Sequence, residues 1–339
     1  MKILSEVPIS TLTTMRLGGP AARVAIVSTP DDVAEAYQYA HDNNLPVTVI
    51  GEGSNLIGRD DGYQGLIIQN QIRGIETIDE SDFDATIIAN SGEVLDDLVA
   101  YSVEKNLHGI EMLTAIPGTV GAAPVQNSGA YGAEIGDTLI AVDVYEIPTG
   151  QFKSLPKSEL ELSYRHSIFN STAVGKYFII AIKIRLYKQN PAPPFYKSLQ
   201  DYLDQQGITN YTPASIREAV ATIRADKLPD PKAIASSGSF FKNVVLTKEQ
   251  ADQFIAEHPE APIFEQKGQF KLATAWLLDQ ANLKGQTFHG MTVNDKAPLV
   301  LMNTSAKSFH DLEAARDQII GIIRDKFGIT IEAEPQIIE

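Results

Sequence analysis

The segment from residue 116 to residue 136 constrains this chain more than any other, because it holds five glycines and two prolines. Together with its alanines, these small residues pack poorly against other side chains. They do suit a flat ligand that lies against exposed backbone. A structural loop of small residues is the alternative, and the length of the segment favours a binding surface over such a loop.

A second glycine-rich segment, residues 51–58, directly follows a short apolar run. A Walker loop needs a lysine after its last glycine, where this chain has Arg59. A dinucleotide fingerprint needs G-x-G-x-x-G at the start of a helix, but here the third glycine is misplaced and further glycines follow. Small residues still let backbone amides approach a phosphate, and Ser54 and Asn55 add donors. An ordinary turn remains the alternative for this segment.

Composition narrows the class of protein. A length of 339 residues predicts two or three domains, and a net charge of −15 argues against nucleic acid as the main partner. The absence of cysteine excludes disulfides and thiolate chemistry, and the six histidines show no metal-ligand spacing, so no metal is expected. Neither a signal-peptide pattern nor an 18-residue apolar stretch occurs, which predicts a cytoplasmic protein without a membrane span.

Hydrophobic periodicity predicts a strand–helix–strand unit at the start of the chain. A strand is expected over residues 22–28, a helix capped by Thr29, and a strand over 46–50. Further strands are expected at 66–69, 85–89, 139–147 and 177–187, and helices at 92–105, from 212, at 273–280 and at 308–327. The proline-rich run 189–194 cannot sustain a helix or a central strand, so it is interpreted as a domain linker.

Seven motifs occur in the order found in the UDP-N-acetylenolpyruvoylglucosamine reductase family, and the chain resembles that family over nearly its whole length. They lie at residues 51–56, 116–131, 163–169, 227–232, 238–243, 275–279 and 332–334. The resemblance implies an α+β fold. An FAD-binding half similar to that of the vanillyl-alcohol-oxidase (PCMH) type would occupy residues 1–188, in two subdomains of about 1–70 and 71–188. A linker with a tyrosine loop would follow at 189–212, and a UDP-sugar-binding domain at 213–339.

The activity implied by the resemblance is the completion of UDP-N-acetylmuramate for bacterial peptidoglycan. NADPH would reduce bound FAD and leave, and UDP-N-acetylglucosamine enolpyruvate would then receive the hydride. The expected enzyme is a monomer with FAD and NADPH as its cofactors. Two rivals stay open: an oxidase with the same cofactor fold, and a non-catalytic protein that only binds a flavin or a UDP-sugar.

Three residues match the catalytic positions of the family. Arg165 matches the arginine that grips the substrate carboxylate, and a guanidinium suits the charge that builds up there. Ser239 matches the proton donor, with Lys242 or backbone amides as possible support. Glu334 matches the C-terminal glutamate, expected to orient Arg165 or to be protonated in the complex, whereas spacing alone does not separate it from Glu332. Without the resemblance, Arg165 would be interpreted as a surface arginine and Ser239 as part of a turn.

The remaining expected site residues bind FAD or the UDP-sugar. The substrate residues implied by the resemblance are Tyr164, Arg165, Tyr196, Lys227 and Asn243. The implied FAD-binding residues are Gly51, Gly53, Ser54, Asn55, Leu56, Ile116, Pro117, Gly118, Gly121, Ala122, Asn127, Gly129, Ala130 and Tyr131. Three positions depart from the usual family pattern: Val244, Asn170 and His166.

Overall fold

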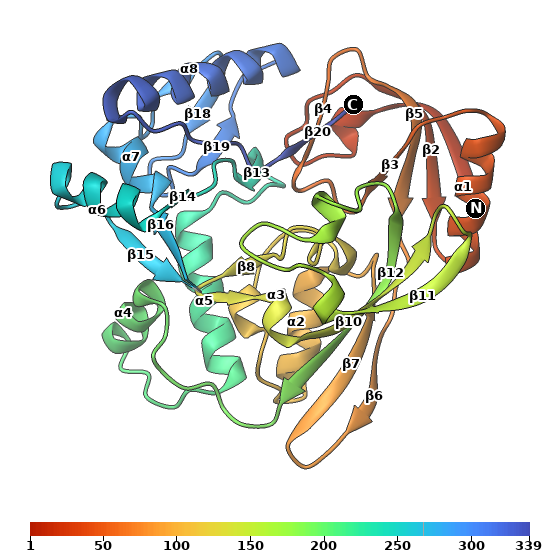
Figure 1. The fold of residues 1–339 in the computed structure, drawn as a ribbon, viewed down its shortest axis with the longest axis horizontal. Coiled ribbons are helices and arrows are strands. Elements are labelled where there is room, and N and C mark those ends of the chain that lie inside the picture. Colours follow the sequence, from red (N-terminus) through yellow and green to blue (C-terminus); the bar gives the residue numbers. More distant parts are fainter. Residues whose placement is uncertain (267) are drawn as a thin grey trace. The chain divides into compact units, whose positions relative to one another are not determined.

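The computed structural model describes residues 1–266 and 268–339, and its chain divides into two compact units (Figure 1). The first unit comprises Met1–Val7, Ala21–Glu52 and Gln64–Asp226. The second comprises Pro8–Pro20, Gly53–Tyr63 and Lys227–Glu339. Each unit therefore gathers stretches that lie far apart in the sequence.

One sheet of the first unit is four-stranded, with the strand order β1-β2-β5-β3. Its strands are β1 (Lys2–Pro8), β2 (Pro20–Val27), β3 (Val47–Ile50) and β5 (Tyr63–Asn70). Helix α1 (Pro30–Asp42) connects β2 to β3, and the Thr29 hydroxyl caps its first turn through a capping box with Asp32. Its buried residues Val33, Ala36 and Ala40 share a core with residues of β2 and β5. The predicted strand–helix–strand unit is thus confirmed.

A second, antiparallel sheet of the first unit has the order β11-β10-β12-β7-β6. Its strands are β6 (Ile75–Glu80), β7 (Asp84–Asn90), β10 (Leu139–Glu146), β11 (Gln151–Pro156) and β12 (Tyr177–Tyr187). Helix α2 (Leu95–Glu104) shares its core through Leu95, Leu98 and Val99. Between α2 and β10 the glycine-rich segment forms only short elements: η3 (Val120–Ala122), β8 (Gly129–Ala130), β9 (Ala133–Glu134) and α3 (Ile135–Thr138). The other 3-10 turns of this part of the chain are η2 (Glu111–Leu113), before the segment, and η4 (Lys157–Glu159) and η5 (Ile168–Asn170), after β11.

Two helices end the first compact unit, which extends beyond residue 212, where the resemblance placed the end of the linker. Helices α4 (Lys197–Gln205) and α5 (Pro213–Lys227) bury Leu199, Leu203, Ile216 and Val220 in a common cluster. Met112 and Tyr131 of the first unit pack against that cluster. The second unit therefore starts at Lys227 instead of residue 213, and it also takes in two N-terminal stretches that the sequence assigned to the flavin half.

Over its described residues, the second unit contains three small sheets and three α-helices. Strands β13 (Ala235–Ser239), β19 (Val300–Asn303), β18 (Met291–Val293) and β17 (Thr287–Phe288) form one sheet. Strands β14 (Val244–Leu246), β16 (Gln269–Leu272) and β15 (Ile263–Gln266) form another, and β4 (Leu56–Gly58) pairs with β20 (Gln336–Ile338). The helices are α6 (Lys248–Glu257), α7 (Thr274–Gln280) and α8 (Phe309–Phe327), with the 3-10 turn η1 (Ile9–Thr11) near the start of the chain.

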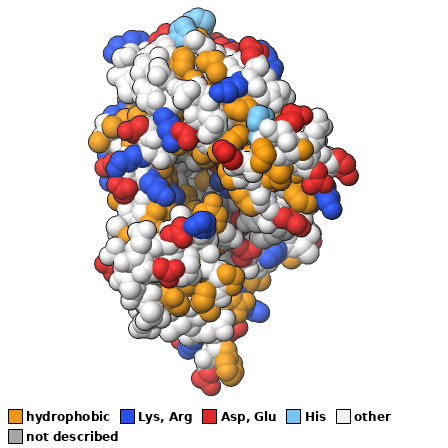
Figure 2. All heavy atoms as spheres, turned by 90° about the vertical axis from the view of Figure 1, so that its left-hand side faces the viewer, with side chains coloured by type: hydrophobic (Ala, Val, Ile, Leu, Met, Phe, Trp, Pro, Cys, Tyr) orange, Lys and Arg blue, Asp and Glu red, His pale blue; other side chains and the backbone are white. Residues whose placement is uncertain are grey.

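The described surface carries both signs of charge. On the face drawn in Figure 2, Lys and Arg side chains lie among Asp and Glu side chains and do not form a continuous basic stripe. Within residues 1–266 and 268–339, no helix has both the length and the apolar character needed to cross a bilayer.

Candidate functional site

The first unit brings one end of each glycine-rich segment together. The Gly118 N–H donates to the Glu52 carboxylate at 3.0 Å, and a Cβ added to Gly51 would overlap the Thr119 hydroxyl. Gly118 has a φ of +119°, which an L side chain rarely adopts. Gly51 and Gly118 are therefore required by backbone geometry and close contact. Ile116, Pro117 and Ala122 lie half-buried or exposed beside them.

Other glycines of the long segment face protein atoms. A Cβ on Gly121 would lie 2.6 Å from Ser91 Cβ, one on Gly136 would lie 2.7 Å from Asn127 Oδ1, and one on Gly129 would overlap the Ala133 carbonyl. The structural-loop interpretation thus explains these three positions. The meeting of the two segments at Gly51 and Gly118, and the exposed edge at Pro117 and Ala122, are the features that fit FAD.

Asn127 joins the glycine-rich segment to the loop at Ser163. Its side-chain amide donates to the Glu134 carboxylate at 3.0 Å and to the Ser163 carbonyl at 3.1 Å, while its oxygen accepts from the Gly136 N–H at 3.0 Å. These bonds occupy both amide hydrogens of a residue that is 2% exposed. Asn127, expected to bind FAD, therefore uses its side chain to join two loops.

Arg165 lies at the tip of a tight two-residue turn. Ser163 and His166 exchange backbone hydrogen bonds of 3.1 Å in both directions, and Arg165 has a φ of +54°. Its guanidinium carbon lies 5.1 Å from the centre of the Tyr164 ring, within cation–π range. Asn170, at a position where the family usually has a basic residue, donates its amide to the Arg165 carbonyl at 3.0 Å. The two predicted substrate residues thus lie side by side on a braced turn.

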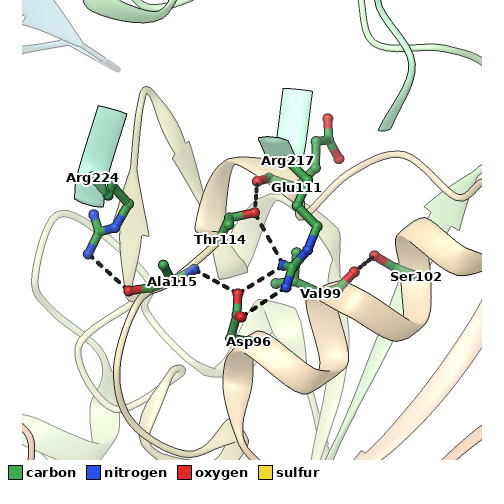
Figure 3. A network of polar contacts seen from close by, with 8 residues as sticks. All are labelled: Asp96, Val99, Ser102, Glu111, Thr114, Ala115, Arg217 and Arg224. Atoms are coloured by element: carbon green, nitrogen blue, oxygen red, sulfur yellow. Dashed lines mark hydrogen bonds and ion pairs between the residues drawn. The ribbon is translucent and has the colours of Figure 1, made fainter. Parts of the chain in front are cut away.

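A polar clamp fixes the residue immediately before the long glycine segment (Figure 3). Asp96 accepts two hydrogen bonds of 2.9 Å from Arg217 of α5 and one of 2.7 Å from the Ala115 N–H. Arg217 also donates to the Thr114 hydroxyl at 3.4 Å, and Ala115 has a φ of +58°. Partial burial raises the pKa of the Asp96 carboxyl, but the bonds from Arg217 and Ala115 outweigh it and hold the pKa below its usual value.

Arg224, on the same helix, interacts with both Ala115 and Tyr131. It donates to the Ala115 carbonyl at 3.2 Å and forms a side-chain hydrogen bond with Tyr131. Burial lowers the pKa of the Arg224 guanidinium, and the same burial raises the pKa of Tyr131. The Tyr131 ring meets the Tyr196 ring edge to face at 6.0 Å between centroids. A predicted cofactor residue and a predicted substrate residue are therefore neighbours.

In the second unit, residues 53–56 lie beside the C-terminal strand. The Gln336 N–H donates to the Asn55 carbonyl at 3.0 Å, and Leu56 pairs with Gln336 in the parallel β4–β20 ladder. The Asn55 amide donates to the Glu334 carbonyl at 3.5 Å. Gly53 has a φ of +64°, and Ser54 follows it half-buried. The predicted nucleotide turn and the predicted catalytic glutamate are thus adjacent.

Ser239 and Glu334 lie on neighbouring segments of the same unit. The Glu334 N–H donates to the Phe240 carbonyl at 2.8 Å, and Phe241 forms an isolated bridge with Ala333. Glu332 is distinguished from Glu334 by exposure: its side chain is 75% exposed and pairs with Lys242 at 3.6 Å, whereas Glu334 is half-buried. The charge of Lys242 is therefore directed at Glu332. Val244 starts β14 and pairs with Leu272, so valine at this position takes part in a sheet.

Arg16 supports the segment that contains the expected pyrophosphate lysine, although its sequence context did not single it out. Its guanidinium donates to the Pro231 carbonyl at 2.7 Å and to that of Lys232, which braces the residues after Lys227. Asn243 accepts a hydrogen bond from the Thr274 N–H at 3.2 Å. The two contacts have no local signal in the sequence, because Arg16 lies 215 positions from Pro231 and Arg217 lies 121 positions from Asp96.

Two family models match different parts of the chain. The family model described as an FAD-binding domain matches residues 21–155. The model described as the C-terminal domain of UDP-N-acetylenolpyruvoylglucosamine reductase matches residues 230–338. A solved UDP-N-acetylenolpyruvylglucosamine reductase from Thermus caldophilus has the same fold, with a TM-score of 0.70, 21% identity and 99% of both chains covered.

Curated relatives extend the similarity along the whole sequence. The UDP-N-acetylenolpyruvoylglucosamine reductase of Bdellovibrio bacteriovorus is 34% identical, with 99% of each chain covered. That of Escherichia coli (strain K12) is 36% identical, with 94% of this chain and 92% of the relative covered. At this identity and coverage, the chain belongs to the UDP-N-acetylenolpyruvoylglucosamine reductase family of FAD-dependent oxidoreductases.

Proposed function

We propose that this chain catalyses the NADPH-dependent reduction of UDP-N-acetylglucosamine enolpyruvate to UDP-N-acetylmuramate in peptidoglycan precursor synthesis. The observation that carries the proposal is the 2.8 Å hydrogen bond from the Glu334 N–H to the Phe240 carbonyl, because it aligns the segments of two predicted catalytic residues. Membership of the family supports the same substrate and a nicotinamide cofactor.

Bound FAD would supply a hydride to the vinyl carbon of the substrate, which becomes the methyl group of the lactyl ether. The electron pair of the double bond would then move to the adjacent carbon, toward the carboxylate. Arg165, braced by its turn, would grip that carboxylate with two donors and stabilise the growing charge. The Ser239 hydroxyl would then transfer its proton to the adjacent carbon and recover one from solvent. Glu334, whose N–H donates to the Phe240 carbonyl, would orient Arg165 or be protonated by burial in the complex.

The two units supply different ligand-binding residues in this proposal. In the first unit, Gly51 and the exposed edge of residues 116–131 would contact FAD, and Tyr164 and Tyr196 would contact the UDP-sugar. In the second unit, residues 53–56 would contact FAD through backbone amides. Lys227 and Asn243 would contact the pyrophosphate there, Lys227 through its charge.

The Ser239→Ala variant tests the proposed reaction. We expect it to retain FAD and to be reduced by NADPH, but to lose substrate reduction by about a hundredfold or more, the usual range for removal of a general acid. Ser305→Ala, which changes an exposed serine of the same unit, is the matched control and should turn over normally. Normal turnover by Ser239→Ala would exclude Ser239 as the proton donor.

The same preparation separates the rival functions. An oxidase would be reoxidised rapidly by oxygen and would show no NADPH turnover, whereas a binding protein would bind the UDP-sugar without reducing it.

We also propose that the enzyme is cytoplasmic and that it is a monomer. Light scattering of the purified protein should then give a mass near 36.9 kDa, and a mass twice as large would contradict the monomer.

A further inference from the structure

Two hydroxyl groups of the second unit are buried without a hydrogen-bond partner among the described residues. Thr13 and Ser237 are each 5% exposed. Among residues 1–266 and 268–339, neither the Thr13 Oγ1 nor the Ser237 Oγ has a hydrogen-bond partner. A buried hydroxyl without a partner is costly, and the great majority of such groups are paired in folded proteins.

The two residues lie on adjacent stretches of backbone at the Gly53 turn. The Ser236 N–H donates to the Thr14 carbonyl at 3.2 Å, and the Thr14 N–H donates to the Gly53 carbonyl at 3.1 Å. A Cβ added to Gly53 would lie 2.8 Å from Thr13 Cα, so the turn and Thr13 are in close contact. Stretches that are distant in the sequence therefore bring Thr13 to the Gly53 turn and Ser236, the neighbour of Ser237, to Thr14.

A bulge in strand β13 sets the position of Ser237. Ser236 pairs with Met302 and Ser239 pairs with Val300, so Ser237 and Gly238 together face a single partner residue. Gly238 has a φ of +70°, and a Cβ added to it would meet nothing within 4 Å. Bulges of this kind re-aim side chains beside active sites. Here the bulge lies immediately before the predicted proton donor Ser239.

Elsewhere in the same unit a buried hydroxyl is paired. Thr274 is fully buried, and its hydroxyl donates to the Lys242 carbonyl at 2.6 Å. The contrast indicates that Thr13 and Ser237 keep their hydroxyls for a ligand. Uncharged donors beside a glycine turn with positive φ suit the oxygens of a phosphate ester.

We propose that Thr13 and Ser237 donate hydrogen bonds to the diphosphate of a bound nucleotide. The inference rests on the proposed function, in which both FAD and the UDP-sugar carry a diphosphate, and it adds two residues that the sequence motifs did not single out. FAD is the expected partner, because Thr13 adjoins the Gly53 turn.

The test uses Thr13→Val and Ser237→Ala, with Thr274→Val as the matched control. Removing a hydroxyl that lacks a protein partner should raise the thermal midpoint of the FAD-stripped full chain by about 1–4 °C. The same changes should speed FAD release from the holoenzyme by about tenfold, measured by the gain in flavin fluorescence. Thr274→Val should lower the midpoint and leave FAD release unchanged.

Each outcome has a definite meaning. Faster FAD release with unchanged affinity for UDP assigns the hydroxyls to FAD, whereas weaker UDP binding to the holoenzyme with unchanged FAD release assigns them to the UDP-sugar. Variants that lose stability as Thr274→Val does, or that bind both ligands normally, overturn the inference. Failure of the wild-type chain to bind FAD or to reduce the enolpyruvyl substrate would instead overturn the proposed function.

Discussion

The Asp96–Arg217 pair should make a measurable contribution to the stability of the first unit. Asp96 receives three hydrogen bonds of 2.7 to 2.9 Å, two of them from one guanidinium. The Arg217 side chain is 23% exposed and that of Asp96 is 34% exposed, so solvent screens the pair only in part. A bidentate, half-buried pair of this kind should couple by about 1–2 kcal/mol, more than an exposed pair.

A double-mutant cycle measures this coupling. Asp96→Asn keeps an oxygen for the Ala115 N–H but removes the charge, and Arg217→Met keeps the length of the side chain. Urea unfolding of the single and double variants should give the coupling of about 1–2 kcal/mol directly. The Asp143–Lys183 pair is the matched control, because it has a similar 2.9 Å contact and exposures of 26% and 29% but only one hydrogen bond. Its coupling should be about 0.5 kcal/mol or less.

The clamp should also affect the cofactor and the response to acid. A loosened Ala115 should speed FAD release from Asp96→Asn by about fivefold, equivalent to about 1 kcal/mol. Because the pKa of Asp96 is lowered by folding, its charge stabilises the protein above the unfolded-state pKa, and this stability is lost as the pH falls through the folded-state pKa. The difference in unfolding free energy between the wild-type chain and Asp96→Asn should therefore decrease as the pH falls over that range. A coupling no larger than that of the control pair would refute this reasoning.

Three further changes probe other parts of the site. Gly51→Ala should destabilise the chain by about 1–3 kcal/mol in urea unfolding, because its Cβ would overlap Thr119, and Thr119→Ala should restore most of the loss. Arg16→Met should raise the KM for the UDP-sugar about fivefold without changing FAD release, and equal effects on both would contradict a local bracing role. Glu332→Gln should change kcat by less than about twofold, because the ion pair of Glu332 with Lys242 is exposed. Glu334→Gln should lower kcat at least about tenfold. A larger effect of Glu332→Gln would assign the catalytic role to Glu332.

Local patterns in the sequence predicted much of the secondary structure. The apolar stripe at 308–327 appears as α8, and the Thr29 cap starts α1 as expected. Both signals depend on neighbours within a few residues, so one sequence is sufficient to detect them. The family motifs likewise located segments that the fold brings together at Ser239 and Glu334.

Long-range contacts could not be predicted in the same way. Strand β4 has only three residues, and its partner β20 lies about 280 positions later. Hydrophobic periodicity therefore does not predict the pairing. The first compact unit includes α5, which the resemblance assigned to the UDP-sugar-binding domain, because α5 buries its apolar face beside Tyr131, a tertiary contact without a local signal in the sequence. The roles of Asn127 and Arg217 depend on atoms of distant loops for the same reason.

The pairing of β4 with β20 has a consequence during synthesis on the ribosome. At about 5–20 residues per second, roughly 14–56 seconds separate the appearance of residue 56 from that of residue 336. Once residue 187 has been made, the two large sheets of the first unit have all their strands, while the Gly53 turn still lacks the strand that completes it. From that point until residue 336 appears, the N-terminal stretches of the second unit remain unpaired, and premature termination would leave them exposed to chaperones and proteases.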